Sequence, residues 1–119
     1  MNCFELSECI DNLIKLTEDD RQEAGRYLDA LIVRLGVRPE AVTSVPYELK
    51  RLAIAVAYRY RALLMSGRGN GIKEVDVYMA KYKAYDAEAK SWETRITPAL
   101  LLGKSQAAAI SPSFSIWRS

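Results

Sequence analysis

The hydrophobic positions of this chain recur every three to four residues through most of its length, which is the period of an α-helix with one apolar face. The widest apolar stripe lies between Pro46 and Ser66, and its members are Leu49, Leu52, Ala53, Val56, Ala57, Tyr60, Leu63 and Leu64. Pro46 suits a helix start, where the N–H that proline lacks is not needed. The small residues in the middle of this stretch would let another helix approach closely. We therefore expect residues 46–66 to form the central helix of the fold.

The same period predicts the other helices. They are expected over residues 7–16, 18–35 and 72–96, with one further turn at 100–102. Thr17 is a good N-cap for the second helix, since it precedes three acidic residues that suit the positive end of a helix dipole. Within 72–96 the apolar positions alternate in steps of three and four residues, close to a heptad repeat, which favours a role in the core or between helices. These positions are Val75, Tyr78, Met79, Tyr82, Tyr85 or Asp86, Ala89, Trp92 and Ile96.

The segment after Gly103 has a different pattern. Ile110, Pro112, Phe114 and Ile116 alternate with three serines, which is the period of a β-strand. The helices offer this strand no partner in its own chain, and unpaired backbone N–H and C=O groups need one. We therefore predict an all-α domain over residues 1–103, a small bundle of about four helices, followed by an extended C-terminal arm over 104–119.

The arm contains large apolar residues, which are Ile110, Phe114, Ile116 and Trp117. Two interpretations are open. The arm is either a disordered tail or a segment that docks on another protein. Exposed large apolar side chains are a liability unless something covers them, so we favour docking by strand addition or by insertion into a groove.

The composition suits one soluble domain. The chain has 119 residues, of which 50% are hydrophobic and 27% charged. Its longest apolar run, 52–58, is far too short to span a bilayer. The first residues lack the basic stretch and apolar core of a signal peptide. We expect synthesis in the cytoplasm and no membrane association.

Charge is unevenly distributed along the chain. Residues 1–24 carry seven acidic side chains, whereas residues 50–73 carry none and contain Lys50, Arg51, Arg59, Arg61, Arg68 and Lys73. Segments of opposite charge suit head-to-tail contacts between copies of one protein. A basic face also suits phosphate. An ordinary solvated face accounts for the basic stretch equally well, so the three alternatives stay open here.

Few residues suit catalysis. The chain has no histidine, which removes the commonest general base and the commonest metal ligand. Two cysteines, Cys3 and Cys9, are too few for a zinc site without histidine. The glycine-rich stretch 67–71 lacks the lysine and serine or threonine of a phosphate-binding loop. We expect no enzyme activity, no cofactor, no metal and idle thiols.

Three features in the second half occur in a characteristic order. The run from Val45 to Arg59 is a Pro-started, Ala-rich helix, the Gly-rich stretch 67–71 follows, and a Tyr- and Lys-rich helix then ends at Ile96-Thr97-Pro98-Ala99-Leu100-Leu101 before Gly103. In pattern and order, residues 45–103 resemble the small head-completion, or head-to-tail connector, proteins of tailed bacteriophages.

This resemblance implies a non-enzymatic virion protein at the head–tail junction. Such adaptors form an oligomeric ring, typically of twelve subunits, beneath the portal protein of the capsid. The ring extends the DNA channel, contacts a tail or tail-completion protein, and lets genomic DNA pass without sequence recognition. The resemblance makes four residues candidates to face DNA or an acidic neighbouring subunit: Arg51, Arg59, Arg61 and Arg68. The alternative is a small helical DNA-binding protein of phage packaging or regulation that uses the basic central helix.

Overall fold

The computed structural model describes residues 3–9, 11, 13–68 and 72–103, with the backbone alone at 68 and 72–75. It contains two short 3₁₀ turns and four α-helices in the order η1 (Leu6–Glu8), α1 (Glu18–Arg34), η2 (Pro39–Ala41), α2 (Tyr47–Arg68), α3 (Ile72–Glu93) and α4 (Pro98–Leu102). Within these ranges there is no β-strand, so the predicted all-α bundle is confirmed. The predicted C-terminal arm lies outside the described residues.

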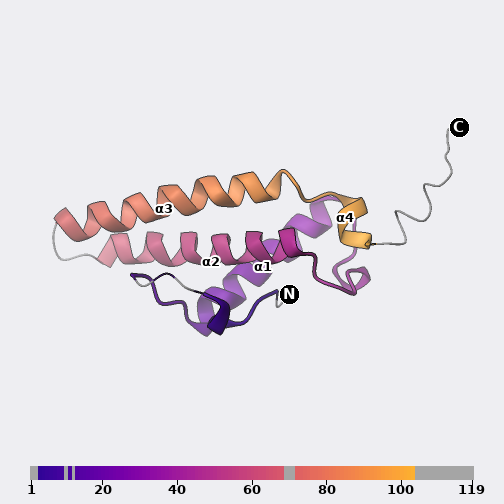
Figure 1. Ribbon diagram of the computed structural model, residues 1–119, viewed down its shortest axis with the longest axis horizontal. Helices are drawn as coiled ribbons and strands as arrows, with labels where there is room; N and C mark the ends of the chain where they lie inside the picture. Colours follow the sequence, from indigo (N-terminus) through magenta and orange to yellow (C-terminus); the bar gives the residue numbers. More distant parts are fainter. Residues whose placement is uncertain (1–2, 10, 12, 69–71, 104–119) are drawn as a thin grey trace, which may run out of the picture.

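The long helices α2 and α3 form an antiparallel hairpin, and α1 crosses α2 obliquely (Figure 1). Each hairpin helix has 22 residues, which corresponds to about 33 Å at the α-helical rise. The short helix α4 lies at the end of the hairpin where α2 begins. The N-terminal segment runs back beside the hairpin and covers part of α2.

The helix α2 is the centre of the core, as its apolar stripe predicts. Seven consecutive residues, 52–58, are buried, so this part of α2 is covered on every side. Leu28 and Ile32 of α1 are fully buried, and Ala89 contributes from α3. The small side chains of α2 allow this close packing from several directions at once.

The predicted seam of α3 is confirmed as its inner face where side chains are described, and the side chain of Val75 lies outside the described part. Ala89 is buried, and four aromatic side chains pack partly buried against the core, namely Tyr78, Tyr82, Tyr85 and Trp92. The helix ends at Glu93, three residues earlier than predicted. The next helix, α4, is the predicted extra turn, capped by Thr97, whose hydroxyl accepts the N–H of Leu100 at 3.1 Å. Gly103 ends it with φ +76°, a conformation that favours glycine.

The predicted helix over residues 7–16 is wrong. The structure has only the turn η1 and then non-helical backbone at the described positions. The carboxylate of Asp11 explains the difference, because its Oδ1 accepts the N–H of Leu13 at 2.8 Å and of Ile14 at 3.1 Å. Such local side-chain bonds compete with helical hydrogen bonds. The N–H of Asp11 is also bound, since it donates to the hydroxyl of Tyr58 at 3.0 Å.

None of the described helices has the length and apolar character required to cross a membrane.

Candidate functional site

The acidic N-terminal region and the basic region of α2 face each other within a single chain. Lys50 pairs with Glu8 at 2.6 Å, and Arg61 pairs with Asp20 at 2.9 Å. A third such contact joins α3 to the N-terminal segment, with Lys81 and Asp11 at 2.9 Å. The first two contacts join the acidic and basic segments seen in the sequence, and the third involves a lysine outside the basic segment.

The pair of Asp20 and Arg61 is the most buried of these contacts. The Asp20 side chain is fully buried, and Arg61 is 16% exposed. Nε of Arg61 donates to both carboxylate oxygens of Asp20, at 3.0 and 2.9 Å. The same carboxylate accepts the N–H of Thr17 at 2.8 Å and its hydroxyl at 3.1 Å. Asp20 thus caps the start of α1 and fixes it to α2 at once.

Asp11 connects the N-terminal segment to α3. Its side chain is 5% exposed, and its Oδ2 accepts hydrogen bonds from Lys81 and from the hydroxyl of Tyr85. The ring of Tyr85 stacks on that of Tyr58, with centroids 4.6 Å apart. Partial burial raises the pKa of Asp11, but the bonds from Tyr85, Lys81 and the Leu13 N–H outweigh it and lower the pKa to about 2. Burial and the Asp11 carboxylate raise the pKa of Tyr85.

An open pocket of about 530 Å³ lies over this contact, between the N-terminal segment, α2 and α3. Its charged lining includes Glu8, Arg51 and Glu88, and each of these already has an ion-pair partner in the chain. A charged ligand would have to break those pairs. We therefore interpret this region as a structural contact.

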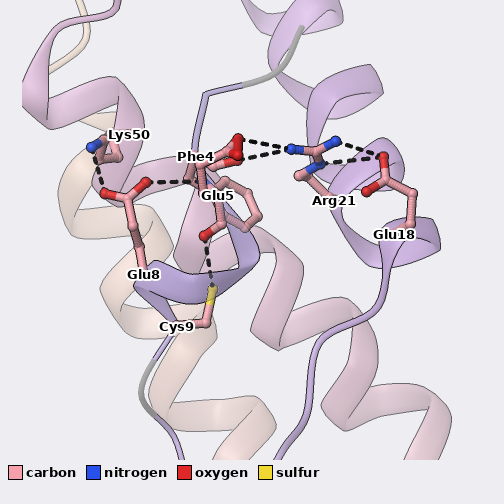
Figure 2. A network of polar contacts seen from close by, with 7 residues as sticks. All are labelled: Phe4, Glu5, Glu8, Cys9, Glu18, Arg21 and Lys50. Atoms are coloured by element: carbon pink, nitrogen blue, oxygen red, sulfur yellow. Dashed lines mark hydrogen bonds and ion pairs between the residues drawn. The ribbon is translucent and has the colours of Figure 1, made fainter.

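The turn η1 is fixed between α1 and α2 (Figure 2). Arg21 of α1 donates to the carbonyl of Phe4 at 3.3 Å and to the carboxylate of Glu5 at 3.1 Å. On the other side, Glu8 accepts from Lys50 and from the N–H of Glu5. The non-helical N-terminal segment is therefore tied to both α1 and α2 by polar contacts.

The replacement Arg21→Ala should loosen this turn. We expect faster hydrogen exchange of the amides of Glu8 and Cys9, which donate to Glu5 and Leu6 within the turn. Hydrogen exchange measured by mass spectrometry checks this, with Arg26→Ala as the matched control, because Arg26 is 66% exposed and pairs with Glu23 of its own helix. Equal exchange of the turn in both variants would contradict the role given to Arg21.

The structure places two of the predicted basic residues, Arg51 and Arg59, on one face of α2 and Arg61 on another. Arg51 and Arg59 both point to α3, where they pair with Glu88 at 3.3 Å and with Asp86 at 3.0 Å. Arg61 points to the start of α1, because residues two positions apart on a helix, such as Arg59 and Arg61, lie on different faces. The side chain of Arg68 lies outside the described residues, and so do the predicted arm residues Ile110, Phe114, Ile116 and Trp117.

A groove that the sequence did not reveal lies between α1 and α3, above α2. Its volume is about 260 Å³, and it is lined by Glu23 and Tyr27 of α1, by Val56, Arg59, Tyr60 and Leu63 of α2, and by Tyr82 of α3. We call it the Tyr60 groove. The only signal in the sequence was the presence of tyrosines on three different predicted helices, which does not show that they converge.

A second exposed aromatic cluster lies near the end of the bundle where α2 begins. The rings of Tyr47 and Trp92 meet edge to face with centroids 5.9 Å apart, and the guanidinium of Arg95 lies 4.7 Å from the Trp92 ring centroid. Tyr47 is 64% exposed. These residue types are common at the centres of protein interfaces.

The cysteine thiols contribute little to these contacts. Sγ of Cys9 donates weakly to the carbonyl of Glu5 at 4.0 Å. Both cysteines are free, and burial raises the pKa of Cys3 to about 11, so this thiol stays protonated and unreactive at neutral pH. Among the residues that the structure describes, no group of three or more histidine, cysteine, aspartate or glutamate side chains could hold a metal ion.

The fold and these surfaces define a small all-α bundle with exposed apolar surface on a long helical hairpin. No protein-family model, curated protein sequence or solved structure matches the chain.

Proposed function

We propose that this protein is a structural head-to-tail adaptor of a tailed bacteriophage, which assembles as a ring under the portal and joins head to tail. The observation that carries the proposal is the resemblance of residues 45–103 to small connector proteins. The hairpin of α2 and α3 supports it, because the two helices have the order and pattern on which the resemblance rests. The exposed apolar residues of the hairpin, among them Leu63 and Val77, are consistent with a protein that assembles.

The basic residues are better explained by helix packing than by a strong DNA contact. Arg51, Arg59 and Arg61 each face a carboxylate of their own chain, which lowers the net positive charge available for phosphate. A DNA channel is compatible with this arrangement, because tight phosphate binding would impede passage of the genome. The alternative, a DNA-binding protein of packaging or regulation, requires an unneutralised basic surface.

Deleting the gene from the phage that encodes it should uncouple heads from tails. We expect separate heads and tails in the lysate by electron microscopy, and tailed particles again when the wild-type protein is supplied from a plasmid. A copy carrying the exposed substitution Arg26→Ala is the matched control and should restore assembly equally. Infectious tailed particles without the protein would overturn the proposed function. Salt-dependent binding of the isolated protein to duplex DNA would favour the alternative.

A further inference from the structure

Exposed apolar side chains gather at the end of the bundle where the chain leaves α4. Tyr47 at the start of α2 is 64% exposed, Val45 just before it is 38% exposed, and Leu102, the last residue of α4, is 41% exposed. The edge-to-face pair of Tyr47 and Trp92 extends this surface onto α3. These residues share one end of the molecule, because α4 lies at the end of the hairpin where α2 begins (Figure 1). We call the four residues the Trp92 patch.

The segment that follows α4 supplies side chains of the same kind. Residues 105–117 contain no charged side chain, and their large apolar side chains are Ile110, Phe114, Ile116 and Trp117. Such a segment can lie on apolar surface without burying an unpaired charge. Rings of phenylalanine and tryptophan also pack favourably on tyrosine and tryptophan. We propose that residues 110–117 bind the Trp92 patch of their own chain.

The length of the chain allows this contact within one molecule. After Trp92 the chain turns, since the N–H of Arg95 donates to the carbonyl of Trp92 at 3.0 Å, and α4 then begins at Pro98. Even with residues 93–97 fully extended, Gly103 would lie within about 30 Å of Trp92. From Gly103 the chain spans up to about 36 Å to Phe114 and about 46 Å to Trp117. Both aromatic residues therefore reach the patch with length to spare.

Covalent connection favours the same chain over a second copy. A random coil of the eleven residues from Gly103 to Phe114 has a root-mean-square span of about 18 Å, which keeps Phe114 close to the patch. A short tether of this kind gives an effective concentration on the order of 1 mM, about a thousandfold above that of a second copy at micromolar concentration. The Tyr60 groove is a more distant alternative, because its floor at Val56 lies about 14 Å along α2 from Tyr47.

In the free protein this contact covers the exposed aromatic rings and the apolar segment at the same time. A partner that binds either surface must first displace the other, so only a partner that binds more tightly than the tethered contact opens it. The contact belongs to the free protein and does not depend on the proposed adaptor function.

NMR relaxation of the full-length protein tests the contact. In the wild type, the heteronuclear NOE of amides 110–117 and of the Trp117 indole should match that of the α2 amides. Tyr47→Glu introduces a charge into the patch at an exposed position in the first turn of α2, where an acidic residue suits the helix dipole, so the fold should be kept. In this variant the NOE of the segment should fall to the values of an unattached chain end. Dilution of the wild type should leave it unchanged, because the tether fixes the effective concentration.

Leu63→Glu is the matched control, since Leu63 is 49% exposed on the same helix, about 24 Å from Tyr47, at the rim of the Tyr60 groove. It should leave the segment as ordered as in the wild type. The double variant Phe114→Asp with Trp117→Asp changes only the segment, so it leaves the helices intact. It should shift the indole resonance of Trp92, because the rings that pack on it are lost.

A mobile segment in the wild type, an ordered segment in Tyr47→Glu, or an unchanged Trp92 resonance in the double variant would each overturn the proposal. Loss of order in Leu63→Glu would also overturn it, because the segment would then occupy the Tyr60 groove. Order that appears only at concentrations where sedimentation equilibrium detects dimers would assign the segment to a second copy instead.

Discussion

Replacing Asp20 by alanine should lower the free energy of unfolding by roughly 3–5 kcal/mol, the usual cost of removing one partner from a buried ion pair. Asp20 is fully buried and accepts four hydrogen bonds, two from Arg61 and two from Thr17. Its loss leaves the guanidinium of Arg61, which is only 16% exposed, without its carboxylate partner. It also removes the capping contact at the start of α1. Urea denaturation followed by circular dichroism measures the change.

The double variant Asp20→Leu with Arg61→Met separates charge burial from packing. Because it removes both charges and keeps similar volume, it should be much more stable than Asp20→Ala. Arg26→Ala is the surface control and should behave like the wild type, since its guanidinium is 66% exposed. A loss of under about 1 kcal/mol for Asp20→Ala would show that the pair contributes little to stability.

Acidification should destabilise the protein through Asp11. The hydrogen bonds from Tyr85, Lys81 and two backbone N–H groups lower the pKa of Asp11 from 3.8 to about 2, against the opposing effect of its burial. Asp11 therefore binds a proton more readily in the unfolded chain than in the folded one. Its contribution to stability is complete above about pH 4 and is lost as the pH falls through about 2. The thermal unfolding midpoint measured between pH 5 and pH 2 should fall accordingly.

The variant Asp11→Asn tests the assignment of this pH dependence. It should be less stable than the wild type at pH 6, by about 2 kcal/mol, because it loses the charge-assisted bonds from Lys81 and Tyr85. Its stability should also fall less between pH 4 and pH 2. The remaining fall reports other carboxylates with lowered pKa, among them Glu8 and Asp86. An identical pH profile for both proteins would exclude Asp11 as the group that titrates. Tyr85→Phe should give an intermediate profile.

The helical part of the fold was accessible from local sequence. The burial of Leu52, Ala53, Val56 and Ala57 follows from an apolar stripe that a helix turns toward its neighbours, and the seam of α3 follows from the same period. The burial of Ile54, Ala55 and Tyr58, which lie outside the stripe, does not follow from it. The capping signal at Thr17 also acted locally, since the N–H of Thr17 donates to the carboxylate of Asp20 three residues away. Local signals fix local structure, so these predictions depended little on the rest of the chain.

The N-terminal segment was mispredicted because hydrophobic spacing takes no account of side-chain bonds to the backbone, whether local or tertiary. Its apolar residues had helical spacing, but Asp11 binds the N–H groups of Leu13 and Ile14, and Tyr58 accepts the N–H of Asp11 itself. The latter contact joins residues 47 positions apart. Single-sequence periodicity contains no information about such a partner. Together, this tertiary bond and the local bonds of Asp11 outweighed the helical preference.

The sequence by itself determined an all-α chain with α2 at its centre, because period and capping act through neighbours along the chain. Only the tertiary structure decided how the charges are used and where a groove lies. Arg51, Arg59 and Arg61 form a basic run in the sequence, yet packing sets each against a carboxylate of α3 or α1. Tyr27, Tyr60 and Tyr82 converge at one groove because three helices meet there. Both outcomes depend on the positions of helices relative to one another, which hydrophobic pattern alone does not specify.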